Sequence, residues 1–316
     1  MKSTLKKLFN PVLAWLLDYL ARSCSSMPFS RKKKLAQLLT FFAWRIIGLR
    51  RREVIASLQL HLELTEAQAE KLGEKVYQHF LLNSFEMASL AYISREDLLA
   101  RIKIEGLEHL DTAMKRNHGA IIVSGHFGLW EMIPQWLAVN GYPVCTVVRR
   151  QNNPHVDAWM ENMRRRLGGK TTDSGFGIRE ILRSIRRGQI LALMVDQDNG
   201  KQGIFVPFFR RYASAPTGPA QLSLKTGAPI VPLFMFPNYC GQHLFKIYPP
   251  IYPENYTNDI TGQQQITACY TQLLEELVRQ QPQDWFWLHR RWKTQPADAP
   301  DNPWARLAND QENAPR

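Results

Sequence analysis

The stretch from Gly119 to Asn140 constrains the fold of this chain more than any other. Ala120 to Val123 is a short apolar run rich in β-branched residues, which predicts a buried strand, and the apolar residues after it recur at helical spacing. The strand passes into the helix through Ser124-Gly125-His126-Phe127-Gly128, whose two glycines permit a tight turn. His126 is therefore predicted at the carboxyl end of a strand, where open α/β sheets bind their ligands.

His126 and Glu131 form an H-x-x-x-x-E motif that suits general base catalysis. A carboxylate beside an imidazole fixes the tautomer and stabilises the imidazolium, so the other ring nitrogen can take a proton from an alcohol. Five helical residues rotate through about 500°, so the two side chains meet only if His126 lies in the turn and Glu131 in the first turns of the helix. The alternative is a capping histidine with a glutamate on a solvated face, because this spacing also arises by chance.

Strands and helices alternate after residue 100. Strands are predicted at 102–105, 120–123, 144–148, 190–195, 230–236 and 244–247, with helices near 107–115, 128–140, 154–167, 178–187, 216–226 and 266–280. This alternation predicts an α/β fold with a mixed, largely parallel central sheet flanked by helices. His126, Arg149 and Asp196 follow three of these strands, so we expect them to meet at one edge of the sheet.

The charge is concentrated at the beginning of the chain. The first 53 residues carry ten of the twelve net positive charges, interleaved with apolar runs that contain Trp15, Tyr19 and Trp44. Both runs are shorter than the roughly 20 residues of a bilayer span, so they predict interfacial helices whose basic flanks attract anionic headgroups on the cytoplasmic side. A helix packed on the core, or a nucleic-acid surface, is the alternative.

Three segments follow from this pattern. We expect basic amphipathic, membrane-associated helices over 1–60, the α/β domain over 61–294, and a disordered, proline-rich polar tail over 295–316. The four cysteines lie far apart without a C-x-x-C pair, which argues against a metal knuckle or a disulfide framework. Asp196-x-Asp198 begins like a calcium loop, but Pro207 stands where the bidentate glutamate belongs. We therefore expect no metal and no cofactor.

Six segments in order resemble the lipid A biosynthesis lauroyl/myristoyl acyltransferase family, a branch of the H-x-x-x-x-[DE] glycerolipid acyltransferases. They are Ser124–Glu131, Arg149–Pro154, Arg164–Gly168, Val195–Asp198, Val206–Phe209 and Trp287–Lys293. The resemblance covers residues 30–293. It departs at Arg210-Arg211, where the family usually has a glycine, and at Ser57–His61, where Asn-Leu-x-x-x-Phe-Pro is common.

The resemblance implies a glycerol-phosphate acyltransferase-like fold and transfer of a fatty acyl chain from acyl carrier protein to a hydroxyl of a lipid A precursor. It implies an enzyme at the cytoplasmic face of the inner membrane, whose partners are acyl carrier protein, a phosphorylated glycolipid and the membrane surface, with no nucleic acid. The catalytic residues would be His126 and Glu131, and the substrate-binding residues Arg149, Asn153, Arg164, Asp196 and Gln197.

Two of those residues, Arg149 and Arg164, are expected to bind phosphates, because a guanidinium binds phosphate through two parallel hydrogen bonds. Asp196 is expected to cap backbone N–H groups or to hold an arginine. The alternatives are acylation of another lipid, such as a phosphatidylinositol mannoside or a lysophospholipid, a hydrolase, and a non-catalytic basic peripheral-membrane protein.

Overall fold

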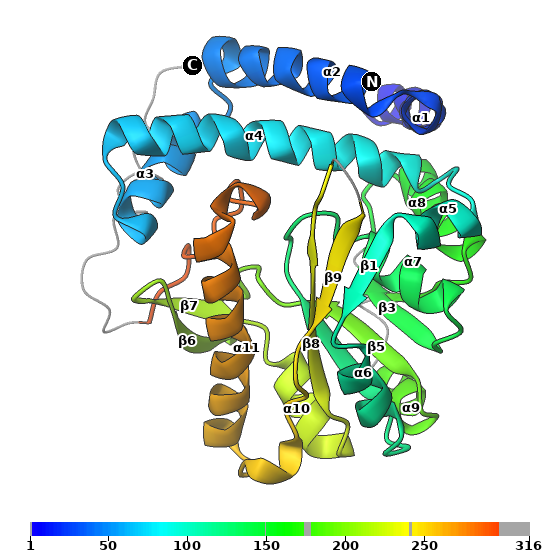
Figure 1. Ribbon diagram of the computed structural model, residues 1–316, viewed down its shortest axis with the longest axis vertical. Coiled ribbons are helices and arrows are strands. Elements are labelled where there is room, and N and C mark those ends of the chain that lie inside the picture. Colours follow the sequence, from blue (N-terminus) through cyan, green and yellow to red (C-terminus); the bar gives the residue numbers. More distant parts are fainter. Residues whose placement is uncertain (1, 149, 174–177, 240–241, 297–316) are drawn as a thin grey trace.

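The structure of the chain is a computed structural model that describes residues 2–148, 150–173, 178–239 and 242–296. The predicted tail lies almost entirely outside this range. The chain begins with helices α1 (Lys2–Ser26), α2 (Phe29–Phe41), the π-helical turn η1 (Phe42–Ile47), α3 (Arg51–Leu62) and α4 (Glu66–Ser89). Figure 1 shows α1 and α2 above α4, which crosses one end of the sheet.

A capping box begins helix α4, because Thr65 Oγ1 accepts the N–H of Gln68 and Gln68 Oε1 accepts the N–H of Thr65. After α4 come the short helix α5 (Arg95–Ala100) and the α/β region.

The central sheet has seven strands in the order β1-β9-β8-β2-β5-β3-β4. They are β1 (Ile102–Glu105), β2 (Ala120–Ser124), β3 (Val144–Val148), β4 (Lys170–Asp173), β5 (Ile190–Met194), β8 (Ile230–Phe236) and β9 (His243–Ile247). Every neighbouring pair is parallel except β8 with β9. The mixed, largely parallel sheet predicted from the sequence is thus confirmed, together with the six strands that were expected.

Helices cover both faces of the sheet. Their bounds are α6 (Leu107–Met114), α7 (Met132–Val139), α8 (Pro154–Arg166), α9 (Ile178–Arg186), α10 (Gly218–Thr226) and α11 (Ile260–Gln280). Strand β2 is buried on both sides: Ala120 and Ile122 pack with α6 and α7, while Ile121 and Val123 pack with α9, α10 and α11. This explains its uninterrupted apolar sequence, which is typical of central parallel strands.

Three local predictions differ from the structure. The helix after His126 begins at Met132 instead of residue 128, because the glycine-containing turn continues through Glu131. Strand β4 was not predicted, since Lys170-Thr171-Thr172-Asp173 is polar and lies at the edge of the sheet. The hairpin of β6 (Ile204–Phe208) and β7 (Arg211–Ala215) was also missed; it forms a separate two-stranded sheet against α11.

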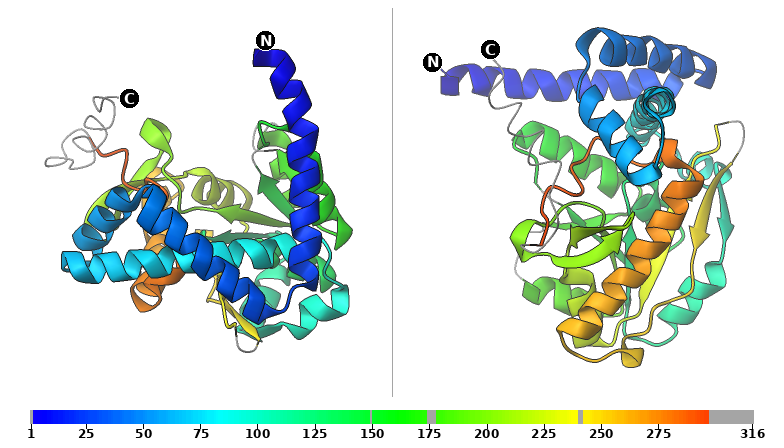
Figure 2. Two further views of the ribbon diagram at one scale, coloured as in Figure 1. Left: turned by 90° about the horizontal axis from the view of Figure 1, so that it is seen from above. Right: turned by 90° about the vertical axis from the view of Figure 1, so that its left-hand side faces the viewer.

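Large apolar side chains remain exposed on the first helices, which project beyond the α/β region in both views of Figure 2. We call this set the N-terminal apolar surface: Val12, Leu13, Trp15, Leu16, Tyr19 and Leu20 on α1, Leu38, Leu39 and Phe41 on α2, and Phe42, Ile46 and Ile47 on η1. In the described part of the chain, no helix combines the length and the apolar character needed to cross a bilayer.

Candidate active site

The candidate site lies where β2 and β5 end. These strands are parallel neighbours, and Ser124 of β2 lies opposite Met194 of β5. His126 and Asp196 each follow two residues later, so the register brings them to the same level at the carboxyl edge. The Val195 N–H donates to the Ser124 carbonyl at 2.9 Å, which extends the pairing toward the site. The predicted convergence of these two strand ends is observed, whereas Arg149 lies outside the described residues.

Asp196 holds His126 through both of its carboxylate oxygens. Oδ1 lies 2.7 Å from the ring Nδ1 of His126, and Oδ2 accepts the backbone N–H of the same residue at 2.7 Å. The indole N–H of Trp285 also donates to Oδ2, at 2.9 Å. Only 3% of Asp196 is exposed. Ring and backbone of His126 are therefore fixed by one buried carboxylate.

Two glycines make this close approach possible. A Cβ on Gly125 would lie 3.1 Å from Asp196 Oδ2 and 3.2 Å from Leu274, so a side chain there would push the carboxylate away from His126. Gly128 has a φ of +59°, and a Cβ on it would lie 2.5 Å from the carbonyl oxygen of Met235. The turn therefore needs glycine at both positions, in agreement with its predicted role.

The hydrogen bonds define the tautomer of His126. Because Asp196 is a carboxylate and can only accept, Nδ1 carries the proton, and Nε2 of the neutral ring is a free base. The side-chain amide nitrogen of Gln197 lies 3.3 Å from Nε2 and is oriented to donate to it. Gln197 follows Asp196 directly, so one strand end contacts both ring nitrogens. This is the arrangement of a base ready to accept a proton.

Electrostatics strengthen that base. Burial disfavours the imidazolium of His126, but the charges of Asp196 and Glu131 outweigh burial and raise its pKa above the ordinary value. For Asp196, burial would raise the pKa, but the charge of His126 and the hydrogen bonds from His126 and Trp285 lower it to about 2. Asp196 is thus ionised throughout the physiological range and stabilises a proton on the ring.

Glu131 forms no hydrogen bond with the ring of His126 in the described structure. The predicted His126–Glu131 pair is therefore wrong. The carboxylate of Glu131 forms two parallel hydrogen bonds with Arg164 of α8, at 2.7 Å to Nη2 and 3.2 Å to Nε. Glu131 lies just before α7, five residues along a turn that carries it away from Nδ1. The carboxylate on Nδ1 comes instead from the neighbouring strand end, as Asp196.

The other predicted substrate-binding residues have different surroundings. Arg164 is 9% exposed and borders a cavity of about 270 Å³, while Glu131 holds its guanidinium. Asn153 caps α8 by accepting the N–H groups of His155 and Val156, and its amide donates to the Asn10 carbonyl of α1. Asn153 therefore joins α1 to α8 and lies apart from His126.

A segment near the carboxyl end completes the turn around His126. Phe286 donates its N–H to the His126 carbonyl at 3.1 Å, and the Gly128 N–H donates to the Asp284 carbonyl at 2.9 Å. Trp285, between them, binds Asp196. Trp287 to Lys293 belongs to the motifs that carry the family resemblance, whereas no role was predicted for Trp285. The signal was the cluster of tryptophans, which is unusual in a polar segment.

A narrow apolar cavity adjoins the ring of His126. Its lining includes Val76 and Phe80 of α4, Trp130 after the turn, and Phe286. The described residues contain no group of three or more His, Cys, Asp or Glu side chains placed to hold a metal ion. The chemistry available from these residues is proton transfer beside an apolar hollow.

Comparison with known proteins identifies the family of the chain. Residues 1–294 match the family model described as bacterial lipid A biosynthesis acyltransferase. The chain is 25% identical to a lipid A biosynthesis acyltransferase of Haemophilus influenzae over 289 residues, which is 89% of this chain and 87% of that protein. It is 28% identical to the lipid A biosynthesis palmitoleoyltransferase of Escherichia coli over 78% of this chain and 81% of that protein.

A third relative is a phosphatidylinositol mannoside acyltransferase of Mycobacterium tuberculosis, 28% identical over 60% of this chain and 59% of that protein. Among solved structures, the 1-acyl-sn-glycerophosphate acyltransferase of Thermotoga maritima aligns with 79% of this chain and 98% of that chain, at 14% identity and a TM-score of 0.39. That likeness is too distant to support an argument. The match to the family model over nearly the whole chain is decisive: the chain belongs to the bacterial lipid A biosynthesis acyltransferase family.

Proposed function

We propose that this protein transfers a fatty acyl chain from the thioester of acyl carrier protein to a hydroxyl of a lipid A precursor, with His126 as general base. The observation that carries the proposal is the contact of His126 Nδ1 with Asp196 at 2.7 Å, which leaves Nε2 as an acceptor at the edge of the sheet. Membership of the family supports the reaction class.

In the proposed mechanism the acceptor hydroxyl takes the place of the Gln197 amide beside Nε2 of His126. The ring removes the hydroxyl proton as the oxygen attacks the thioester carbonyl, and the imidazolium that forms is stabilised by Asp196. Collapse of the tetrahedral intermediate breaks the carbon–sulfur bond, and the imidazolium returns its proton to the leaving thiolate. Asp196 thus acts on the ring, and His126 acts on the substrate.

The tetrahedral intermediate requires hydrogen-bond donors for its oxyanion. The backbone N–H groups of Leu129, Trp130 and Glu131 have no partner among the described residues and lie between the turn and the start of α7. We assign the oxyanion to these groups. Glu131 has a second role in the proposal, because its hydrogen bonds with Arg164 orient the guanidinium toward a phosphate of a substrate.

The proposal places the protein at the cytoplasmic face of the inner membrane. The N-terminal apolar surface exposes tryptophan, tyrosine and phenylalanine next to basic residues, a composition suited to the interface of an anionic bilayer. Acyl carrier protein is the proposed donor because an acidic carrier complements a chain with a net charge of +12.

One other acceptor has specific support. The similarity to a phosphatidylinositol mannoside acyltransferase makes a mannosylated phospholipid the second candidate acceptor. The His126–Asp196 pair and the thioester donor would be the same. The two candidates differ only in the lipid that brings the hydroxyl to His126.

The test is acyl transfer by the purified full-length protein in detergent. A radiolabelled acyl carrier protein thioester is offered with a lipid A precursor, a phosphatidylinositol mannoside or a lysophospholipid, and products are separated by mass. We expect acylated lipid A precursor from the wild type and none from His126→Ala. Acylation of only another lipid would change the acceptor, and release of free fatty acid with every acceptor would make the protein a hydrolase. Equal transfer by folded His126→Ala would refute the proposed base.

A further inference from the structure

A polar cavity lies outside the site of His126, between the turn that joins α1 to α2 and the end of α4. It measures about 180 Å³. Its polar lining comes from Ser25, Lys32, Glu86, Arg101, Asn238, Tyr239 and His243. Nothing in the proposed transfer reaction uses these side chains.

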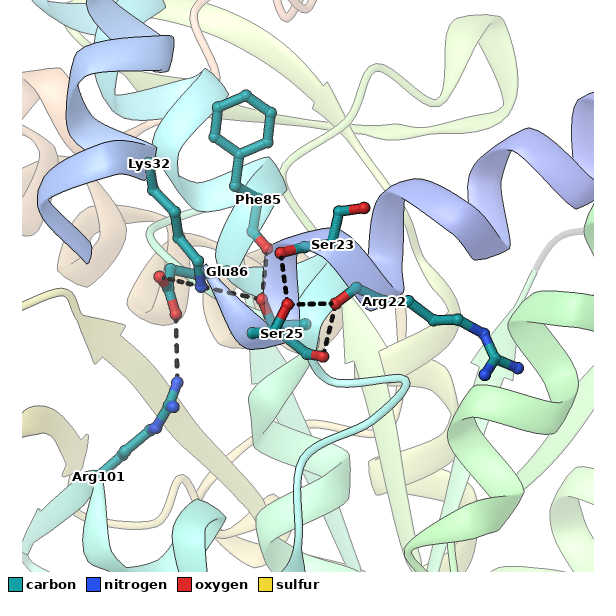
Figure 3. A network of polar contacts seen from close by, with 9 residues as sticks. Arg22, Ser23, Ser25, Lys32, Phe85, Glu86 and Arg101 are labelled. Carbon is teal, nitrogen blue, oxygen red and sulfur yellow. Dashed lines mark hydrogen bonds and ion pairs between the residues drawn. The ribbon is translucent and has the colours of Figure 1, made fainter. Parts of the chain in front are cut away.

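Lys32 is the most buried charge in this cavity. Only 3% of the residue is exposed, and its ammonium group donates to Glu86 Oε1 at 2.8 Å and to Ser89 Oγ at 3.0 Å. Figure 3 shows Lys32 extending from α2 toward Glu86 on α4. An ammonium group has three N–H donors, so one remains after these two contacts. Burying a lysine requires compensation, and Glu86 supplies only part of it.

Arg101 adds a second cation to the same carboxylate. Its Nη1 lies 3.3 Å from Glu86 Oε2, on the side opposite Lys32 in Figure 3. The backbone of Arg101 is held because its carbonyl accepts the N–H of His243 at 2.7 Å. With 42% of its side chain exposed, the guanidinium keeps donors for a ligand. Two cations and one carboxylate leave the cavity with an excess positive charge.

His243 contributes a neutral donor. Its Nδ1 accepts the backbone N–H of Asn238 at 3.1 Å, so the proton of the neutral ring lies on Nε2. Burial lowers the pKa of His243 to about 4, which keeps the ring neutral. The cavity also meets the start of α2 at Phe29, and the amino end of a 13-residue helix favours an anion. Lys32, Arg101 and His243 therefore bring N–H donors to one cavity. Its carboxylate, Glu86, already accepts hydrogen bonds from two cations.

We propose that this cavity binds a phosphoryl group, held by Lys32, Arg101 and His243. The oxygens of a phosphate accept hydrogen bonds, and the groups of the lining that can form further hydrogen bonds are N–H donors. The negative charge of the ligand would further offset the cost of burying the positive charge of Lys32. A phospholipid headgroup and a soluble phosphate ester present the same group, and the experiment separates them. Binding here is independent of acyl transfer.

The test measures binding of inorganic phosphate and glycerol 3-phosphate to the full-length protein by calorimetry at constant ionic strength. Co-sedimentation with phosphatidylcholine vesicles, with and without phosphatidic acid, tests the headgroup. Arg101→Gln removes one cation, and Lys103→Gln on the adjoining strand β1 is its control, since Lys103 pairs with Glu105 on the surface and has the same charge change. The double variant Lys32→Met/Glu86→Gln removes the buried pair without altering net charge.

We expect saturable binding that falls about tenfold in Arg101→Gln and at least as much in the double variant, the size of one lost charge-assisted hydrogen bond. Lys103→Gln and His126→Ala should bind like the wild type, so loss of transfer in His126→Ala leaves this proposal intact. Binding of soluble phosphate supports a soluble ester, and a preference for phosphatidic acid vesicles alone supports a headgroup. The absence of both, or an equal loss in Lys103→Gln, would overturn the proposal.

Discussion

The molecule contains two histidine–aspartate pairs with the same contact and different surroundings. His126 Nδ1 lies 2.7 Å from Asp196, and His79 Nδ1 lies 2.7 Å from Asp284. In both pairs only 3% of the aspartate side chain is exposed. Both pairs also reach the same turn, since Asp284 accepts the N–H of Gly128 through its carbonyl.

The difference lies in what surrounds each ring. His126 follows a central strand, and the second oxygen of Asp196 binds its own backbone, so ring and main chain form one rigid unit. His79 lies in the middle of α4, and among the described residues the second hydrogen bond to the side chain of its aspartate comes from the neighbouring Gln283, at 3.3 Å. A short histidine–carboxylate distance therefore does not by itself identify a base. His126 differs in its position at a strand end and in having one carboxylate bind both its ring and its backbone N–H, whereas the His79 pair joins α4 to the turn.

The largest expected effect is that of His126→Ala. Removing the base should lower kcat by about 10²–10⁴-fold, because that is what general base catalysis typically contributes. Loss of the ring also leaves buried Asp196 without its histidine, as His79→Phe does for Asp284, so the free energy of unfolding should fall by about 1–3 kcal/mol while backbone contacts keep the turn folded. Steady-state kinetics and thermal unfolding on the same preparation would check both. A folded variant that retains most of its activity would make the two pairs equivalent.

Asp196→Asn should lower kcat almost as much as His126→Ala, and the hydrogen bonds of Asp196 explain why. Oδ2 accepts two N–H groups, so the amide oxygen must take that position and the NH₂ group must face Nδ1. The ring then carries its proton on Nε2 and cannot accept another from the substrate.

The same substitution predicts a change in pH dependence. Transfer requires neutral His126, so the wild-type rate should fall as the pH drops through the raised pKa of His126. Loss of the Asp196 charge removes the main cause of that rise, so the acidic limb of the kcat/KM profile should move to lower pH. An unshifted limb would mean that the limb belongs to another group.

Arg164→Gln should have an intermediate effect, mainly on KM for the phosphorylated substrate, because a phosphate contact remote from the reacting carbonyl stabilises ground and transition states alike. Glu131→Gln should act through Arg164, so the double variant should be no worse than Arg164→Gln alone, with a coupling of about 0.5–3 kcal/mol. Arg183→Gln is the control, since Arg183 pairs with Glu180 on the exposed face of α9, away from the cavity that Arg164 borders. Additive losses would give Glu131 a role of its own.

His79→Phe tests the second histidine–aspartate pair. It leaves buried Asp284 without its histidine, so the free energy of unfolding should fall by about 1–3 kcal/mol, the cost of an unpaired buried group. Because the ring does not contact the reacting atoms in our proposal, kcat measured below the melting temperature should stay near the wild-type value. A loss comparable to that of His126→Ala would place both pairs in the reaction.

The smallest effect is expected far from either pair, at Arg210→Gly. Phe209 and Arg210 both have left-handed backbone angles, with φ of 53° and 58°, in the two-residue turn between β6 and β7. Glycine adopts this conformation without strain, and the surface pair of Arg210 with Glu63 contributes little. We expect a rise in melting temperature of about 2 °C with unchanged transfer. A fall would show that the surface pair outweighs the strain.

The sequence predicts the sheet well because its strands are buried runs separated by clear turn residues. Ala120–Val123 and Ile190–Met194 are both apolar throughout, so the ends of β2 and β5 could be located within a residue. The edge strand β4 and the β6–β7 hairpin lack that contrast. Predicting the site also requires the strand order, since the pairing of His126 with Asp196 depends on β2 and β5 being neighbours. Proximity in the sequence favoured Glu131, whereas strand order brings Asp196 to the ring. Trp285 reaches Asp196 across 89 residues, and no local pattern encodes that contact.

The contact of Trp285 with Asp196 has a consequence for synthesis of the chain on the ribosome. The first 200 residues contain His126, Asp196 and Glu131, yet the carboxylate of Asp196 receives its indole donor, and the Gly128 N–H its acceptor, from residues 284 and 285. Until that segment leaves the exit tunnel, the buried charge of Asp196 lacks one of its three N–H donors. In a nascent chain, therefore, the turn around His126 and the carboxylate of Asp196 stay incompletely held until residues 284 and 285 have left the tunnel.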